Sequence, residues 1–286
     1  MIMRLKSYCT NSCLIISCFC LLSCKEKSEL NSNFAINDLL PIYGDTLIAV
    51  RNKSGLLITI NGGKNWEVLN DKVYFKKIII DSKKVLWGLD SWIGIHEPSY
   101  STLYYSKDFG KNWKEVKFNT EVFFPINIVS KPFEKLRVIT ENWKKYELVG
   151  DDPNKDWLSI ESGDQNDSNN ITTGPYKISF AGYLIKENKN VGSKDTLLKL
   201  NDISIPFQIL LDKDTLFVAG GGYGGYKAYF SSISLSDTIL TTYQVLGIQI
   251  LGIRKDNFDR LWLFGDGGIF LKKNDTILNM YPSITK

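Results

Sequence analysis

Cysteine is absent from residues 25–286, because all five cysteines of this 286-residue chain lie at Cys9, Cys13, Cys18, Cys20 and Cys24. Disulfides and thiolate metal sites are therefore excluded from the body of the protein. His96 is the only histidine, which excludes multi-histidine metal centres and leaves one candidate for a Ser-His or Cys-His pair. We expect neither a metal nor a cofactor, and stability must come from packing.

Arginine and net charge are also low. Beyond residue 24 arginine occurs only at Arg51, Arg137, Arg254 and Arg260, and the net charge of the whole chain is +4. Loss of residues 1–23, with Arg4 and Lys6, would reduce this charge to about +2, too weak a field to indicate nucleic acid as a partner. Hydrophobic residues make up 43% of the chain, which provides a substantial core and excludes a disordered protein.

The amino terminus has the form of an export signal. Arg4 and Lys6 precede an apolar stretch over 14–22 that is too short to cross a bilayer. It ends in Leu21-Leu22-Ser23-Cys24, which resembles the lipobox of bacterial lipoproteins. The resemblance implies a signal peptide over 1–23, lipidation of Cys24, a polar tether over 24–33 and attachment to a membrane of the bacterial cell envelope. The envelope location is the outer membrane or cell surface, with the periplasmic side as an alternative. An ordinary secretory signal is the alternative to the lipobox.

A repeat organises the rest of the chain. Residues 106–113 read Ser-x-Asp-x-Gly-x-x-Trp, residues 59–66 repeat this with Thr for Ser and Asn for Asp, and a weaker copy covers 150–157. A short polar side chain can accept hydrogen bonds from the N–H groups of its own turn, and Gly or Asn tolerates a left-handed φ. We interpret each copy as a structural turn that leads into an outer strand. Its residues are Thr59, Asn61, Gly63, Trp66, Ser106, Asp108, Gly110, Trp113, Asp152, Asn154 and Trp157.

The spacing of the repeat predicts the architecture. Asp-Thr followed by two aliphatic residues marks the same place in later units, at 195–198, 237–240 and 275–278, so outer strands should begin near 66, 113, 157, 196, 238 and 276. These intervals match the length of a four-stranded propeller blade. We predict an all-β chain with a single β-propeller over 34–286, built from six four-stranded antiparallel blades, with five or seven as alternatives. The most apolar strands, such as those over 73–80, 203–211 and 245–253, should line the axis. The first strand of the fourth unit cannot be placed.

The repeated turns resemble the Asp-box, or BNR, repeat of the sialidase-like propeller superfamily, and Leu261–Ile269 is similar to the repeat of sensor propellers in two-component regulators. The resemblance implies that the Asp boxes lie between third and fourth strands, on the face opposite the usual ligand site. It therefore assigns the box residues a structural role.

Loops between second and third strands should build the opposite face, where we place the candidate ligand site. A phosphate-binding loop at 220–226 is disfavoured, because no Lys-Ser/Thr and no helix follow it. We interpret this run as a hairpin that presents two tyrosines. A histidine and a glutamate at 96–97 are a conceivable acid–base pair, with an ordinary surface role as the alternative. The candidate residues of this face are Arg51, Asp90, Trp92, His96, Glu97, Tyr100, Glu141, Trp143, Tyr223, Tyr226 and Asp266.

Three classes of function fit these features. Aromatic and polar residues on the loop face favour a non-catalytic module that binds a glycan, a peptide or a partner protein. A glycosidase that uses carboxylates across the channel mouth is the second class, although a sialidase would need an arginine cluster and the Arg-Ile-Pro motif of that family, which is absent. A structural or sensory envelope subunit is the third.

Overall fold

The chain divides into two compact units, Met1–Ser32 and Asn33–Lys286. The computed structural model describes residues 35–52, 54–92, 99–118, 124–129, 135–141, 143–160, 172–179, 181–188, 192–203, 205–222, 227–245 and 247–280, all within the second unit. Cys24, His96, Glu97, Tyr223 and Tyr226 lie outside these ranges. In the described part of the chain, no helix is long and apolar enough to span a membrane.

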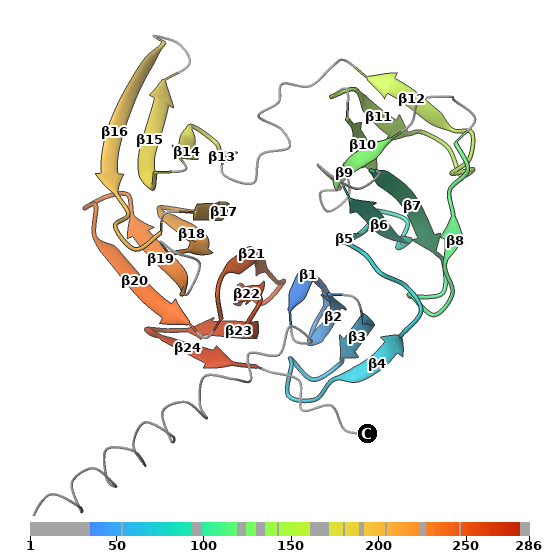
Figure 1. The fold of residues 1–286 in the computed structure, drawn as a ribbon, viewed down its shortest axis with the longest axis horizontal. Helices are drawn as coiled ribbons and strands as arrows, with labels where there is room; N and C mark the ends of the chain where they lie inside the picture. The colour runs from blue at the N-terminus through green and yellow to red at the C-terminus, as the bar shows by residue number, and fades with distance from the viewer. Residues whose placement is uncertain are drawn as a thin grey trace, which may run out of the picture. The chain divides into compact units, whose positions relative to one another are not determined.

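The second unit consists of four-stranded antiparallel sheets, each formed by consecutive strands (Figure 1). The first two sheets are β1 (Ile36–Tyr43), β2 (Thr46–Arg51), β3 (Gly55–Thr59) and β4 (Glu67–Asn70), then β5 (Lys77–Ile80), β6 (Leu86–Trp92), β7 (Tyr100–Ser106) and β8 (Lys114–Glu115). The next two are β9 (Pro125–Val129), β10 (Arg137–Thr140), β11 (Lys145–Leu148) and β12 (Trp157–Ile160), then β13 (Thr172–Thr173), β14 (Tyr176–Ile178), β15 (Tyr183–Asn188) and β16 (Ser193–Lys199). The last two are β17 (Ile205–Asp212), β18 (Thr215–Gly221), β19 (Ala228–Ser234) and β20 (Leu240–Val245), then β21 (Ile250–Lys255), β22 (Leu261–Gly265), β23 (Gly268–Lys273) and β24 (Thr276–Asn279).

The described residues thus form six sheets, which confirms the prediction of an all-β propeller with six four-stranded blades. The first strands of the blades face the common axis and the fourth strands lie outside (Figure 1). The strand that the sequence could not place, β13, is only two residues long. A strand this short carries no readable alternation of apolar and polar residues.

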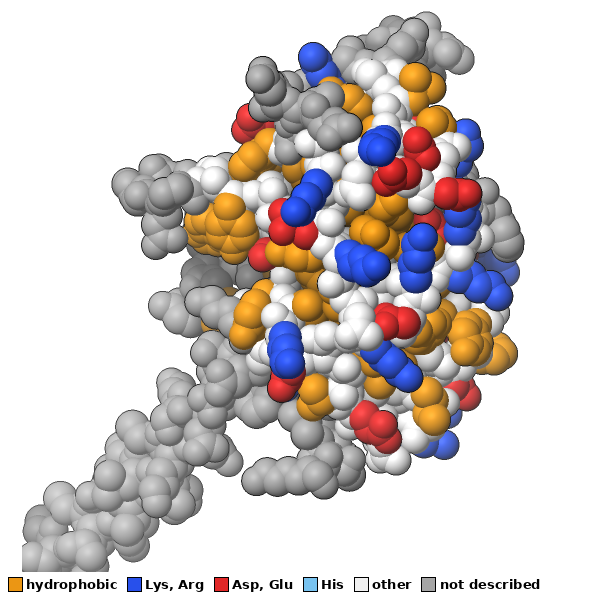
Figure 2. All heavy atoms as spheres, turned by 90° about the vertical axis from the view of Figure 1, so that its right-hand side faces the viewer, with side chains coloured by type: hydrophobic (Ala, Val, Ile, Leu, Met, Phe, Trp, Pro, Cys, Tyr) orange, Lys and Arg blue, Asp and Glu red, His pale blue; other side chains and the backbone are white. Residues whose placement is uncertain are grey.

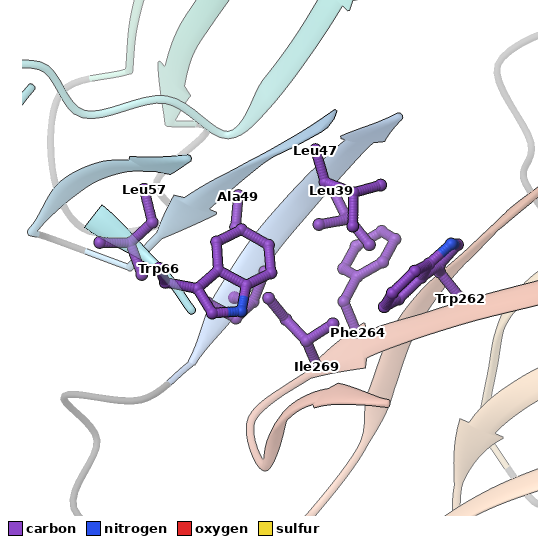
Figure 3. Close-up of a cluster of buried hydrophobic side chains, with 9 residues drawn as sticks. Leu39, Leu47, Ala49, Leu57, Trp66, Trp262, Phe264 and Ile269 are labelled. Atoms are coloured by element: carbon purple, nitrogen blue, oxygen red, sulfur yellow. The ribbon is translucent and has the colours of Figure 1, made fainter. Parts of the chain in front are cut away.

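Buried apolar side chains fill the spaces between neighbouring blades. Between the last blade and the first, Trp66 packs with residues of β1, β2, β3, β22 and β23, and its side chain is fully buried (Figure 3). Trp113 packs in the same way between the first and second blades, and Trp157 between the second and third. Each tryptophan therefore joins its own blade to the preceding one, and does more than cover its hairpin.

The two stronger turns have the same hydrogen bonds. In the first, Thr59 Oγ1 accepts from Gly63 N at 3.0 Å and Asn61 Oδ1 accepts from Asn65 N at 3.0 Å. In the second, Ser106 Oγ accepts from Gly110 N at 2.8 Å and Asp108 Oδ1 accepts from Asn112 N at 2.9 Å. The Trp66 and Trp113 indoles donate to the carbonyls of Gly63 and Gly110. In both turns a hydroxyl group and a carboxamide or carboxylate group accept hydrogen bonds from the backbone, one of them from a glycine. These bonds fix the turn that precedes the outer strand.

The third copy is built differently. Gly150 offers no hydroxyl, and Asp156 Oδ2 instead accepts from Asp152 N at 2.8 Å. The Trp157 indole donates to Pro153 O at 2.6 Å. Asn154, expected in the glycine's role, accepts from Lys117 N at 2.8 Å through its Oδ1 atom. Asn154 therefore links this turn to the segment that follows β8.

A second recurring turn, which the sequence reading missed, joins first and second strands. Asp81 accepts from Lys83 N and Val85 N, and from the Trp87 indole at 2.9 Å. Asp256 accepts from Phe258 N and Arg260 N, and from the Trp262 indole at 2.8 Å. The spacing Asp-x-x-x-x-x-Trp is the same in both blades and was readable in the sequence.

Candidate functional site

A cavity of about 780 Å³ lies over the first strands of five blades. This volume is within the range of small-molecule sites. Its lining residues come mainly from β1, β5, β6, β9, β17 and β21, with contributions from β22, from the segment before β5 and from the ends of β2 and β7. They are Asn37, Asp38, Asn52, Tyr74, Phe75, Lys76, Lys77, Leu89, Asp90, Ser91, Trp92, Tyr100, Ile126, Asn127, Gln208, Leu251, Arg254 and Phe264.

Several polar side chains that line the cavity lie on strands that are otherwise apolar. We refer to Asp38, Lys77, Asn127, Gln208 and Arg254 as the cavity floor. Asp38 of β1 and Gln208 of β17 each follow a shift in strand register, between Ile36 and Asp38 and between Pro206 and Gln208. Such bulges re-aim a side chain relative to the regular pleat. The two side chains consequently reach the neighbouring first strands, where Asp38 Oδ2 accepts from Ile78 N at 3.0 Å and Gln208 Oε1 accepts from Ile253 N at 2.7 Å.

Asp38 and Arg254 form an ion pair across the junction of the last and first blades. Arg254 Nη2 lies 2.6 Å from Asp38 Oδ1, and the Asp38 side chain is only 2% exposed. Leu39 N donates to the same Oδ1 atom at 2.9 Å. The Arg254 guanidinium also donates to Gln208 and lies over the ring of Phe264. Both carboxylate oxygens of Asp38 are therefore engaged within the protein.

Lys77 of β5 is the other cation of the floor. Its ammonium donates to Asn127 Oδ1 of β9 at 2.9 Å, and within the described residues it forms no ion pair. Burial lowers the pKa of Lys77 to about 8; Arg254 acts in the same direction and Asp38 opposes it. The protein thus holds an ammonium in the cavity with a neutral amide as its partner, an arrangement that costs folding free energy.

Three half-exposed aromatic side chains border the cavity. Trp92 and Tyr100 are cross-strand partners at the end of the β6–β7 pair, and Tyr74 precedes β5. Their exposed fractions are 52%, 51% and 49%. We refer to Tyr74, Trp92 and Tyr100 as the aromatic rim. Exposed aromatic faces beside polar groups suit ligands that are apolar on one face and polar at their edges.

The structure brings together only part of the predicted ligand face. Asp90, Trp92 and Tyr100 line the cavity. Burial raises the pKa of Asp90, opposed by a side-chain hydrogen bond with Tyr100. Arg51, Glu141, Trp143 and Asp266 are not among the lining residues, and the four candidates at 96, 97, 223 and 226 lie outside the described residues.

Local contacts explain where these other candidates lie. The Arg51 guanidinium donates to Ser54 O, and its buried Nε atom has no hydrogen-bond partner in the described structure. Trp143 sits in the β10–β11 turn with φ of 60°, and its N–H donates to Thr140 O. Asp266 occupies the tight turn after β22, where burial raises its pKa and a hydrogen bond with Gln249 opposes the shift. These three residues are therefore engaged in contacts near their own turns and do not line the cavity.

Five residues of the floor were missed by the sequence reading: Asp38, Lys77, Asn127, Gln208 and Arg254. Lys77 and Gln208 had a readable signal, because each is a polar residue inside a strand expected to line the axis, over 73–80 and 203–211. No such strand was delimited around Asp38, Asn127 or Arg254. The first strands were read as continuously apolar, so these interruptions were not given weight.

The side of the molecule shown in Figure 2 has no patch of a single charge sign among its described residues. On the side shown in Figure 2, Lys and Arg side chains are interspersed with Asp and Glu. Among the described residues, no cluster of three or more His, Cys, Asp or Glu side chains could hold a metal ion.

No protein-family model matches the sequence, and no curated protein is similar to it at a significant level. The structure is similar to YCF48 from Cyanidioschyzon merolae, with a TM-score of 0.44, 13% identity, and coverage of 86% of this chain and 85% of that one. A structure of YCF48 bound to D1 peptide gives a TM-score of 0.41, 15% identity, and coverage of 83% and 78%. The extracellular domain of the putative hybrid two component system BT3049 from B. thetaiotaomicron gives 0.49, 11% identity, and coverage of 87% and 40%. At these values the ligands of those proteins cannot be transferred to this chain.

Proposed function

We propose that this chain is a non-catalytic binding protein whose ligand, a glycan, occupies the cavity over the first strands. The observation that carries the proposal is the aromatic rim together with the side-chain amides that line the same cavity, which are Asn37, Asn52, Asn127 and Gln208. Sugar rings present apolar C–H faces to aromatic side chains and hydroxyl edges to amides. Few convergent polar groups in an aromatic-lined cavity are typical of small-ligand sites.

Contacts along the first strands favour a glycan over an extended peptide. A peptide that added as a strand would need free N–H and C=O groups at the edge of a sheet. On the inner edges, Asp38 accepts from Ile78 N, Gln208 accepts from Ile253 N, and Asn37 Nδ2 donates to Phe75 O at 3.0 Å. These groups are thus occupied by side chains of neighbouring blades. A peptide or protein partner is the second candidate, since the aromatic rim would suit its apolar side chains.

The carboxylates of the cavity favour binding over hydrolysis. A glycosidase needs one acidic and one basic or nucleophilic carboxyl group beside the same bond. Among the described lining residues the carboxylates are Asp38 and Asp90, and Asp38 is engaged by Arg254 and two backbone N–H groups. Asp90 is then the one remaining carboxylate among the described lining residues, where this chemistry needs two. Release of reducing ends from a polysaccharide, abolished by Asp90→Asn, would support the enzyme instead.

The wider setting of the protein is part of the proposal. The repeated turns support membership of the sialidase-like, BNR-repeat propellers, and Leu21–Cys24 supports a bacterial lipoprotein anchored in the cell envelope. Radiolabelled palmitate should be incorporated by the wild-type chain in a bacterial host and not by Cys24→Ala. A labelled Cys24→Ala protein would contradict lipidation at this residue. A structural or sensory envelope subunit is the reading that applies if the cavity binds nothing.

Titration of the protein with a panel of defined oligosaccharides tests the proposed site. Trp92→Ala and Tyr100→Ala should weaken binding of any recognised oligosaccharide by about tenfold or more, because each removes a stacking surface. Tyr43→Ala is the matched control, since Tyr43 is 64% exposed at the other end of β1. Equal affinity for the wild type and the two rim variants would place the ligand elsewhere. Failure of every oligosaccharide to bind would contradict the glycan proposal.

A further inference from the structure

The ammonium of Lys77 forms no ion pair with a carboxylate in the described structure. Arg254 is paired with Asp38 at 2.6 Å, whereas Lys77 Nζ donates to the neutral amide of Asn127 at 2.9 Å. Lys76, beside it, also lines the cavity and is exposed. The floor therefore has an excess of positive charge beneath the aromatic rim.

We infer that the ligand is an acidic glycan, with the carboxylate of a uronic acid bound by Lys77 and a sugar ring stacked on the aromatic rim. This inference rests on the proposed function and adds the chemical class of the sugar. A carboxylate would complete the ion pair that Lys77 lacks, and hydrogen bonds between ionised groups are stronger than those between neutral ones. Asn127 already holds the ammonium in place, so little side-chain entropy remains to be lost on binding.

Charge balance in the cavity favours an acid over a neutral sugar. Asp38 is occupied by Arg254 and by backbone N–H groups, and the repulsion of Lys77 by Arg254 outweighs its attraction by Asp38. Asp90 forms a side-chain hydrogen bond with Tyr100, and burial raises its pKa. The described lining residues thus include three cations, Lys76, Lys77 and Arg254, and two carboxylates, Asp38 and Asp90, which leaves a net positive charge.

The test compares uronic-acid oligosaccharides with carboxyl-reduced forms of the same chain length and linkage. Galacturonate, glucuronate and mannuronate trimers are each titrated against the wild type, Lys77→Gln and Lys64→Gln. Lys64 is an exposed lysine in the turn before Trp66 and serves as the matched control. At least one acidic trimer should bind the wild type and Lys64→Gln about tenfold or more tightly than its reduced form. Lys77→Gln should bind both forms alike.

The pattern of failure separates this inference from the proposed function. If reduced and acidic trimers bind equally well and both depend on Trp92, the cavity binds glycans but the acid is not recognised, and the inference is wrong. If an acidic trimer binds Lys77→Gln as tightly as the wild type, the inference is also wrong. If no trimer of either form binds, the inference fails, and binding in the wider panel of the preceding section decides whether the glycan proposal stands.

The pH dependence of binding provides a second readout. The groups that set the charge state of Lys77 are Arg254 of β21, Asp38 of β1 and Lys76 of its own segment. Because the pKa of Lys77 is about 8, affinity for the acidic trimer should decline as the pH rises above 8. This decline should be absent in Lys77→Gln. A wild-type affinity that stays constant to pH 10 would contradict the role of Lys77.

Discussion

Arg254 Nη2 lies 2.6 Å from Asp38 Oδ1, although the two residues are separated by 216 positions in the sequence. Each blade is formed by consecutive strands, so no strand is exchanged between the last blade and the first. The junction of these blades depends on side chains: this ion pair, the ion pair of Arg260 with Asp45 at 2.5 Å, and the cluster around Trp66. Stability of the propeller should therefore be most sensitive to substitutions here.

Loss of the Asp38 carboxylate should be strongly destabilising. Asp38→Ala leaves Arg254 and Ile78 N without their partner in a buried setting, and we expect a loss of about 3–5 kcal/mol in the free energy of unfolding. The control is Lys83→Ala, which breaks the exposed ion pair with Asp151 and should cost less than about 1 kcal/mol. Urea unfolding measures both values. Equal losses would show that the Asp38 pair does not stabilise the junction.

Substitution of Trp66 should destabilise the protein strongly, whereas substitution of Trp92 should leave its stability nearly unchanged. Trp66 is fully buried in the cluster between the last and first blades, so Trp66→Ala should lower the free energy of unfolding by about 3–5 kcal/mol. Trp92 is 52% exposed, and Trp92→Ala should change stability by less than about 1 kcal/mol while weakening ligand binding. Thermal unfolding of both variants checks this contrast. A strongly destabilised Trp92→Ala protein would assign Trp92 to the core instead of the ligand site.

Each repeated turn should contribute a modest amount of stability. Thr59→Ala and Ser106→Ala remove the oxygen that accepts from Gly63 N or Gly110 N, and each should cost about 1 kcal/mol. Ser236→Ala is the control, because the Ser236 hydroxyl shares a hydrogen bond with the Ser234 hydroxyl at an exposed site. Denaturant unfolding of the three variants measures these losses. A loss in Ser236→Ala equal to the other two would show that the turns have no special role.

Acid should weaken the turn over 106–113 and not the turn over 59–66. Hydrogen bonds from Asn112 and Ser106 lower the pKa of Asp108 to about 2, below an ordinary value of about 3.9. The ionised form is therefore favoured in the folded state, and its contribution is present above pH 4 and lost as the pH falls toward 2. The stability difference between the wild type and Asp108→Asn should shrink over this range. Asn61 occupies the same position in the first turn and does not titrate, so Asn61→Ala should show a constant difference.

The charge of Lys77 should destabilise the folded protein, whereas the charge of Asp108 stabilises it. Its pKa of about 8 in the folded protein is below an ordinary lysine value of about 10.4, so between these pH values the unfolded chain binds more protons. Wild-type stability relative to Lys77→Gln should therefore rise as the pH increases from 8 to 10. At pH 7 we expect Lys77→Gln to be at least as stable as the wild type. A less stable variant at pH 7 would indicate that Lys77 is a structural residue.

Regular features of the fold were predictable from the sequence because they are local. Outer strands begin close to 66, 113, 157, 196, 238 and 276, since turn residues and alternating apolar residues act over short distances. The direction in which a first-strand side chain points depends on neighbouring blades and on bulges, as at Asp38 and Gln208. For this reason the cavity floor was missed, and Asp90, Trp92 and Tyr100, which were expected in a loop, lie within the paired ends of β6 and β7.

The account depends most on the claim that a ligand occupies the cavity bordered by Tyr74, Trp92 and Tyr100. A crystal structure of the protein with a uronic-acid trimer tests this claim directly. We predict a sugar ring in contact with Trp92 or Tyr100 and a carboxylate oxygen about 3 Å from Lys77 Nζ. A trimer bound at the repeated turns or on the outer strands, with the cavity occupied only by solvent, would contradict the account.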